Sequence, residues 1–156
     1  MRFLNFKSIT TIIICFLAYG LSQGQVLTKE SIKYQYDDEI PKQDSEFGEI
    51  HVKKGKQIQV NFDCCFEDTI ELYVNSVLID RIYLQTEAAT SFTNYSKLID
   101  FEKHDKKTIL KMIIPNKSIY CEIELDKNYK ILHVNRLENS NIKWWIIFRN
   151  FEITYE

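Results

Sequence analysis

Short runs of alternating apolar and polar residues, separated by polar turns, fill the chain from Gly48 onward. In the segment Ile58–Phe62, for example, Ile, Val and Phe alternate with Gln and Asn. A period of two places every second side chain on one face of a β-strand, whereas a helix needs a period near 3.6. No segment of ten or more residues has a convincing helical period, so the chain is predicted to be all-β.

Eight to ten strands are expected from this pattern, with polar segments as the turns between them. The strands are expected at residues 50–52, 58–65, 70–74, 77–84, 108–114, 119–125, 129–134 and 143–155, with one or two more within 89–101. Gly55 is expected at positive φ, Asn75-Ser76 in a tight turn and residues 126–128 in a hairpin. The segment 77–84 is more continuously apolar, which predicts a strand covered on both faces.

Many short strands with polar turns favour an antiparallel two-sheet β-sandwich, either immunoglobulin-like or jelly-roll-like. A small closed β-barrel is the alternative, because the number of strands alone does not separate it from a sandwich. A small outer-membrane β-barrel fits the sequence less well. Charged residues such as Glu71 and Lys111 occupy strand faces, and glycine is scarce.

The first 24 residues have the pattern of a secretory leader. Arg2 and Lys7 precede an apolar run at residues 9–17, and small residues follow up to Gly24. The run is too short to span a membrane, which takes about 20 apolar residues. Residues 1–24 are therefore predicted to be a removed signal peptide. The mature protein is expected in the periplasm or outside the cell, with no stable membrane insertion.

The leader has two candidate cleavage points, before Gln23 and before Gln25. The second is preferred, because the polar composition of the mature chain begins there. Cys15 does not fit a lipoprotein signal, since Ile14 precedes it and the apolar run continues beyond it.

After the leader, the chain has the size of one ordinary domain. Residues 25–47 form a polar segment in which the alternation at 32–36 predicts one edge strand, and residues 48–156 form the sandwich domain. The formal net charge of −2 argues against nucleic acid as a partner. There is no glycine-rich phosphate loop, so no cofactor is expected. Lys far outnumbers Arg, which is typical of AT-rich bacterial genomes.

No residue is assigned a catalytic, cofactor-binding or metal-binding role. His51, His104 and His133 lack the spacing of zinc ligands. The acidic residues Asp63, Glu67 and Asp68 are a weak calcium candidate, because the glycine that usually shapes such a loop is absent. There is also no GxSxG nucleophile motif.

Two adjacent tryptophans are the candidate binding residues. Trp144 and Trp145 lie on one expected strand, so their side chains should point to opposite faces. Core packing is expected for at least one of them, and an exposed one would be a platform for a glycan or an anchor for a protein. The chain is thus predicted to be a non-enzymatic binding module for an unidentified protein or glycan partner. The alternatives are a small secreted hydrolase and a structural component of the cell envelope.

A disulfide between Cys64 and Cys121 is predicted from the same alternation. Cys64 shares a strand face with Phe62, and Cys121 shares one with Ile123, so both should point into the core. Export makes oxidation feasible. Two buried free thiols are the alternative, and a Cys65–Cys121 pair would need a bulge in the strand.

The leader can be tested on the exported protein. Mass spectrometry of the amino terminus should find Gln25 or Gln23, because the signal peptidase removes the residues before it. Met1 in the exported protein would contradict the prediction.

Overall fold

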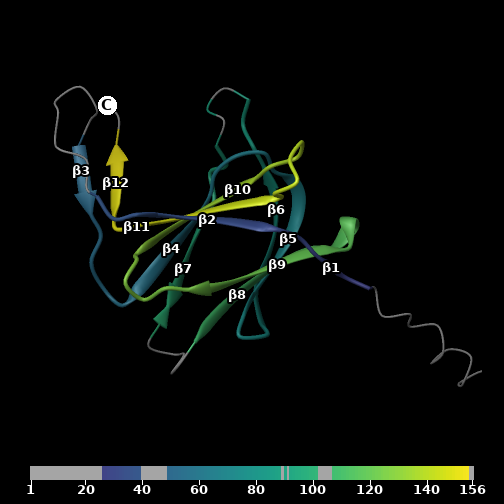
Figure 1. Ribbon diagram of the computed structural model, residues 1–156, viewed down its shortest axis with the longest axis horizontal. Coiled ribbons are helices and arrows are strands. Elements are labelled where there is room, and N and C mark those ends of the chain that lie inside the picture. Colours follow the sequence, from purple (N-terminus) through teal and green to yellow (C-terminus); the bar gives the residue numbers. More distant parts are fainter. Residues whose placement is uncertain (1–25, 40–48, 89, 91, 102–106, 155–156) are drawn as a thin grey trace, which may run out of the picture.

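The described part of the chain forms twelve β-strands and one short 3-10 turn in the computed structural model (Figure 1). It covers residues 26–39, 49–88, 90, 92–101 and 107–154. The strands are β1 (Thr28–Lys29), β2 (Ile32–Asp37), β3 (Glu49–Val52), β4 (Gln57–Phe62), β5 (Glu67–Val74), β6 (Val77–Gln85), β7 (Ser96–Asp100), β8 (Thr108–Ile114), β9 (Ile119–Leu125), β10 (Ile131–Arg136), β11 (Trp144–Arg149) and β12 (Phe151–Thr154), and the turn is η2 (Pro115–Lys117). The prediction of an all-β chain is confirmed.

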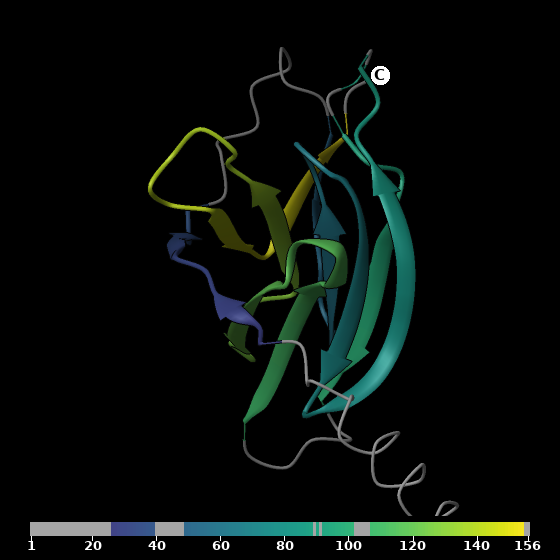
Figure 2. The ribbon, with the colours of Figure 1, turned by 90° about the vertical axis from the view of Figure 1, so that its right-hand side faces the viewer.

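Two five-stranded sheets face each other (Figures 1 and 2). Sheet A has the order β1-β9-β8-β5-β6 and sheet B the order β2-β11-β10-β4-β7, while β3 and β12 pair with each other beyond the end of sheet B. Among the described strands no backbone pairing joins one sheet to the other, so the sandwich is confirmed. The polar N-terminal segment supplies β2, which lies at the edge of sheet B.

The sheets are mixed and not purely antiparallel. The pairs β1–β9, β2–β11 and β4–β10 are parallel. The prediction of a hairpin at residues 126–128 is wrong. That segment carries the chain from β9 in sheet A to β10 in sheet B, so the two strands it joins are not paired with each other. Alternation shows which residues share a face of a strand, but it does not say which strand lies alongside.

The core lies between the inner faces of the two sheets. In β5 every second residue is buried, and the same alternation holds in β4. The largest side chain in this core is that of Trp144, which is fully buried and packs against the ring of Phe66 at 6.3 Å between centroids. Other fully buried core residues are Ile58, Phe62, Ile70, Leu72, Leu84, Leu110, Met112, Ile114, Ile123 and Phe148.

Two expected strands differ from the structure. The segment 77–84 forms β6, which lies at the edge of sheet A and exposes Val77, Leu78 and Tyr83, so the expected burial on both faces is wrong. The long final strand is interrupted at Asn150, because β12 leaves sheet B and pairs with β3.

Two turn predictions are confirmed. Asn75 and Ser76 have φ values of 48° and 69° and join β5 to β6 in a two-residue hairpin, and Gly55 has a φ of 129°. Left-handed φ values at both central residues match the twist of the flanking strands.

One lateral margin of the sandwich is joined by an inward-facing ion pair. Asp80 on β6 accepts hydrogen bonds from Lys97 Nζ and from the Tyr95 hydroxyl, both at 2.7 Å. These hydrogen bonds, the one from Lys97 first, lower the pKa of Asp80 below its ordinary 3.8. Because β6 and β7 are the edge strands of different sheets, the contact ties sheet A to sheet B.

The opposite margin is closed by Glu30, which lies between β1 and β2. Its carboxylate pairs with the buried guanidinium of Arg136 and accepts a hydrogen bond from Trp144 Nε1 at 2.7 Å. The Arg136 guanidinium also lies over the Trp144 ring, 4.4 Å from its centroid. Removing one member of a buried pair leaves the other charge uncompensated.

Replacement of Glu30 by alanine should therefore lower the free energy of unfolding by about 3–5 kcal/mol. The matched control is Glu122→Ala, which removes an exposed ion pair of 3.9 Å with Lys29 and should cost less than about 1 kcal/mol. Urea unfolding followed by tryptophan fluorescence measures both. Equal losses in the two variants would contradict the role given to Glu30.

Candidate ligand-binding site

A hollow of about 570 Å³ lies on the outer face of sheet B. One row of outward-facing side chains crosses four strands there, because Ile147, His133, Asn61 and Ser96 are successive partners in the registers of β11, β10, β4 and β7. The residues on either side of His133 and of Asn61 along their strands are buried in the core, which turns these two side chains outward.

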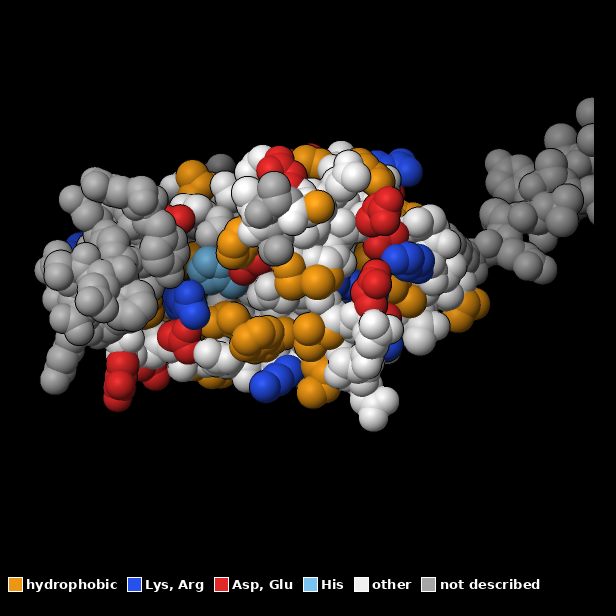
Figure 3. Space-filling view, turned by 90° about the horizontal axis from the view of Figure 1, so that it is seen from above, with side chains coloured by type: hydrophobic (Ala, Val, Ile, Leu, Met, Phe, Trp, Pro, Cys, Tyr) orange, Lys and Arg blue, Asp and Glu red, His pale blue; other side chains and the backbone are white. Residues whose placement is uncertain are grey.

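The hollow combines aromatic walls with polar groups. Its lining consists of Asn61, Phe62, Asp63, Phe92, Thr93, Asn94, Tyr95, Ser96, His133, Asn135, Trp145, Ile147, Arg149 and Glu152. In the space-filling view, one face of the molecule shows hydrophobic side chains around a histidine, with charged side chains beside them (Figure 3). The volume falls within the range of small-ligand sites.

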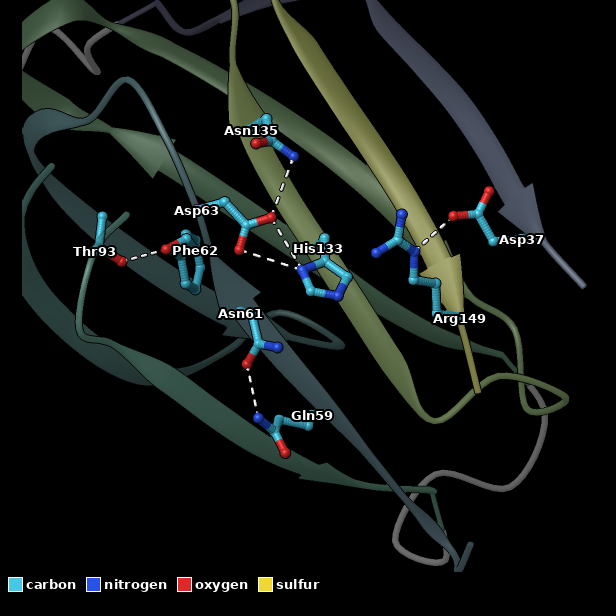
Figure 4. A network of polar contacts seen from close by, with 9 residues as sticks. All are labelled: Asp37, Gln59, Asn61, Phe62, Asp63, Thr93, His133, Asn135 and Arg149. Carbon is cyan, nitrogen blue, oxygen red and sulfur yellow. Dashed lines mark hydrogen bonds and ion pairs between the residues drawn. The ribbon is translucent and has the colours of Figure 1, made fainter. Parts of the chain in front are cut away.

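An aspartate–histidine pair lies in the hollow. Asp63 follows the end of β4, and its two carboxylate oxygens lie 3.0 and 3.2 Å from His133 Nδ1 (Figure 4). Asn135 Nδ2 donates a longer hydrogen bond of 3.5 Å to the same carboxylate. Since a carboxylate only accepts, Nδ1 carries the proton. Nε2 is then an acceptor when the ring is neutral, and no partner for it is seen within the described residues.

A second charged pair lies on the neighbouring strands. Arg149 Nε donates to Asp37 at 2.6 Å, and Gln35 Nε2 donates to the same carboxylate at 2.7 Å. Partial burial raises the pKa of Asp37, but the hydrogen bonds from Gln35 and Arg149 outweigh it and hold the pKa below its ordinary 3.8. Asp37 is therefore ionised at neutral pH, and the pair carries no net charge.

The loop before β7 forms one wall of the hollow and is tied to the end of β4. Thr93 N–H donates to the carbonyl of Asp63 at 2.9 Å, and the Thr93 hydroxyl donates to the carbonyl of Phe62 (Figure 4). These bonds hold Phe92, whose side chain is 54% exposed, beside the hollow. The aromatic ring is thus available to a ligand from solvent.

The two tryptophans lie on opposite faces of sheet B. Trp144 is in the core, whereas Trp145 lines the hollow next to Asn135, its register partner on β10. Lys33 Nζ lies 5.5 Å from the centroid of the Trp145 ring. The indole nitrogen of Trp145 is buried, and no partner for it is found in the described part of the chain. A buried donor of this kind calls for a water or ligand oxygen.

The disulfide predicted between Cys64 and Cys121 is absent from the structure, in which Cys64, Cys65 and Cys121 are free thiols. Cys121 is buried on β9, and burial raises its pKa. Strand β4 ends at Phe62, however, so the alternation that would direct Cys64 inward stops two residues earlier. The Cys64 sulfur instead lies 3.0 Å from the sulfur of Cys65, and Phe66 enters the core.

The histidines and acidic residues weighed as metal ligands do not form one cluster in the described part of the chain. His104 lies outside the described residues, as does the leader, and the His51 side chain is not described. Asp63 pairs with His133, while the buried Asp68 pairs with Lys117 at 2.8 Å, so the two are engaged separately. Over the described ranges, no three His, Cys, Asp or Glu side chains come together as metal ligands.

The row across the hollow does not bring a serine hydroxyl within reach of His133. Ser96 is the hydroxyl in the same row, but Asn61 lies between it and His133. Two strand spacings amount to about 10 Å. A base and its nucleophile need about 3 Å.

Comparison with protein-family models, with curated proteins and with solved structures finds no match. Within the described ranges, no helix is long and apolar enough to cross a membrane.

No short sequence motif predicts the Asp63–His133 pair or the Asp37–Arg149 pair. Their members are 70 and 112 residues apart. Only the outward placement of one of two adjacent tryptophans follows from local alternation.

Replacing Arg149 by glutamine should raise the pKa of Asp37 toward 3.8, measured by NMR titration of its carboxyl group. A carboxylate with a depressed folded pKa contributes stability above its unfolded pKa, and this contribution is lost as pH falls through the folded value. The variant should thus be less stable than the parent above about pH 4, by about 1 kcal/mol or less, and the two should converge in acid. The control Arg81→Gln, which removes an exposed guanidinium paired with Glu71 on the other sheet, should leave the titration of Asp37 unchanged.

Proposed function

We propose that this protein is a non-enzymatic binding module and that the hollow on sheet B holds a neutral glycan. The observation that carries the proposal is the placement of Trp145, a large aromatic side chain turned out of the sheet into a hollow that also holds polar side chains. Tryptophan combines a broad apolar surface with one polar nitrogen, which suits a ligand with both apolar faces and hydroxyl groups.

The charges around the hollow support a ligand without net charge. Asp63 is paired with His133, Arg149 with Asp37, and Glu152 with Lys53 at 3.1 Å. Each of these charged side chains is therefore already engaged, the Asp63 carboxylate by a hydrogen bond and the other two carboxylates by a cation. An anionic or cationic ligand would have to break one of these pairs, at a cost in free energy.

The polar groups also match hydroxyls, which both donate and accept hydrogen bonds. Asn61, Asn94 and Asn135 line the hollow, and each amide side chain carries an acceptor oxygen and two donor hydrogens. Asn94 donates one hydrogen to Glu87 at 2.5 Å and Asn135 donates one to Asp63, which leaves the second donor of each for a ligand. Asn61 Oδ1 accepts from Gln59 Nε2 at 2.8 Å, which fixes the amide and leaves its NH₂ group as a donor. The hydroxyls of a sugar ring can form hydrogen bonds with these amide groups, whereas an apolar ligand would leave them without partners.

Replacement of Trp145 by alanine should weaken glycan binding at least tenfold, because aromatic anchors at the centre of a site carry about 2 kcal/mol or more. Affinity electrophoresis of the full chain through gels with neutral or acidic soluble polysaccharides identifies the ligand. Calorimetry then measures the dissociation constant for the parent and the variant.

The matched control is Tyr83→Ala, an aromatic that is 56% exposed on β6 and outside the hollow on sheet B. This variant should bind as the parent does. Retention of acidic polysaccharides alone, or equal binding by the Trp145 variant, would contradict the proposed site. Release of reducing sugar from a retained polysaccharide would contradict the non-enzymatic role.

A further inference from the structure

The turn between β4 and β5 holds two adjacent thiols in contact. The Cys65 thiol points at the sulfur of Cys64, and the two sulfur atoms are 3.0 Å apart. Cys65 is exposed and has a φ of 69°. A left-handed conformation is uncommon for a residue other than Gly, Asn or Asp, and such outliers persist where the surrounding structure enforces them.

Hydrogen bonds to other strands hold the backbone on both sides of this pair. Asp63 N–H donates to the carbonyl of Val134 at 2.9 Å, and Arg136 N–H donates to the carbonyl of Cys64 at 3.1 Å. Beyond the pair, Phe66 N–H donates to Thr86 Oγ1 at 2.9 Å, and the Phe66 carbonyl accepts from Thr86 N–H at 2.9 Å. The chain conformation that brings the sulfurs together is therefore built into the fold, and thiols held in this way react with each other as a unit.

We propose that Cys64 and Cys65 are a redox-modification site, where a small-molecule or protein disulfide converts the thiol pair into a reversible bond between neighbouring residues. Neither cysteine lines the hollow, so the reaction of the thiol pair does not require that a glycan binds there. The Cys65 thiolate attacks the external disulfide and releases one thiol, which leaves a mixed disulfide on Cys65. Cys64 then loses its proton to solvent, attacks the Cys65 sulfur and releases the second thiol. Two protein thiols and one disulfide thus become one protein disulfide and two thiols.

The surroundings of the two thiols assign their order of reaction. Cys65 is exposed and meets the external disulfide first. Cys64 is half-buried, and burial, followed by a hydrogen bond with Cys65 that favours the protonated Cys64 thiol, raises its pKa to about 12, so it is a poor first nucleophile. Once the mixed disulfide has formed, Cys65 is neither a thiol nor a thiolate, so it no longer raises the pKa of Cys64, and Cys64 faces the reactive sulfur directly.

The closed ring should also be easy to reduce. Adjacent Cα atoms are about 3.8 Å apart across a trans peptide, which is shorter than the span of ordinary disulfides. Disulfides away from their preferred geometry are the more readily reduced ones. The bond is thus expected to be a reversible modification and not a permanent staple.

Peptide mapping of the full chain tests the proposal. Trypsin cuts after Lys56 and Arg81, and the resulting peptide, residues 57–81, contains Cys64 and Cys65 but no other cysteine. After treatment of the folded protein with oxidised glutathione and alkylation, this peptide should be lighter than its reduced form by two hydrogen atoms and carry no alkyl group. Dithiothreitol should restore both thiols.

The variants separate the roles of the two cysteines. Cys64→Ser should accumulate the glutathione adduct on Cys65, because no neighbouring thiol displaces it. Cys65→Ser should react several-fold more slowly. Cys121, on tryptic peptide 118–127, is buried and serves as the internal control that stays reduced. A wild-type peptide that keeps two free thiols, retains glutathione on Cys65 or joins a second chain would overturn the proposal.

Discussion

Parallel pairing of β4 with β10 is the constraint on which the functional face depends. The pairing places Asn61 beside His133, and backbone hydrogen bonds continue past the end of β4 through Asp63 and Cys64. Parallel strands cannot be joined by a short turn, so the two halves of the face come from distant parts of the chain. The aspartate–histidine pair, the loop that walls the hollow and the thiol pair are therefore all products of the completed fold.

The period of two predicts local structure well and partner choice poorly. Strands β8 and β9 occupy the expected residues 108–114 and 119–125, because the burial of alternate side chains leaves a direct trace in the sequence. The crossing from β9 to β10 could not be read from the sequence, because a short polar segment is found both in hairpins and in connections between two sheets. The Asp63–His133 pair could not be predicted either, because alternation does not show that β4 lies beside β10. Placement of Cys64 failed for a different reason, namely that the strand ended before the alternation did.

The polar N-terminal segment has a structural role that its composition does not suggest. It gives β1 to sheet A and β2 to sheet B, and the carboxylate of Glu30 lies between the two strands. At the other margin, Asp80 and Lys97 join β6 to β7. The sandwich is thus held by apolar packing in the middle and by ion pairs along both sides, and the segment that precedes the main alternation supplies one of these sides.

The inward-facing pair of Asp80 and Lys97 also bears on how molecules of this protein meet one another. Strand β6 is nine residues long, ends its sheet and exposes Val77 and Leu78, features that invite a strand from a neighbouring molecule. The register of β6 with β5 shifts between Leu72 and Tyr73, and an irregular edge is a poor template for further pairing. A strand added to β6 or β7 would also strip water from the charged groups that the two edges share. Both features make these margins poor templates for edge-to-edge pairing with another molecule of this protein.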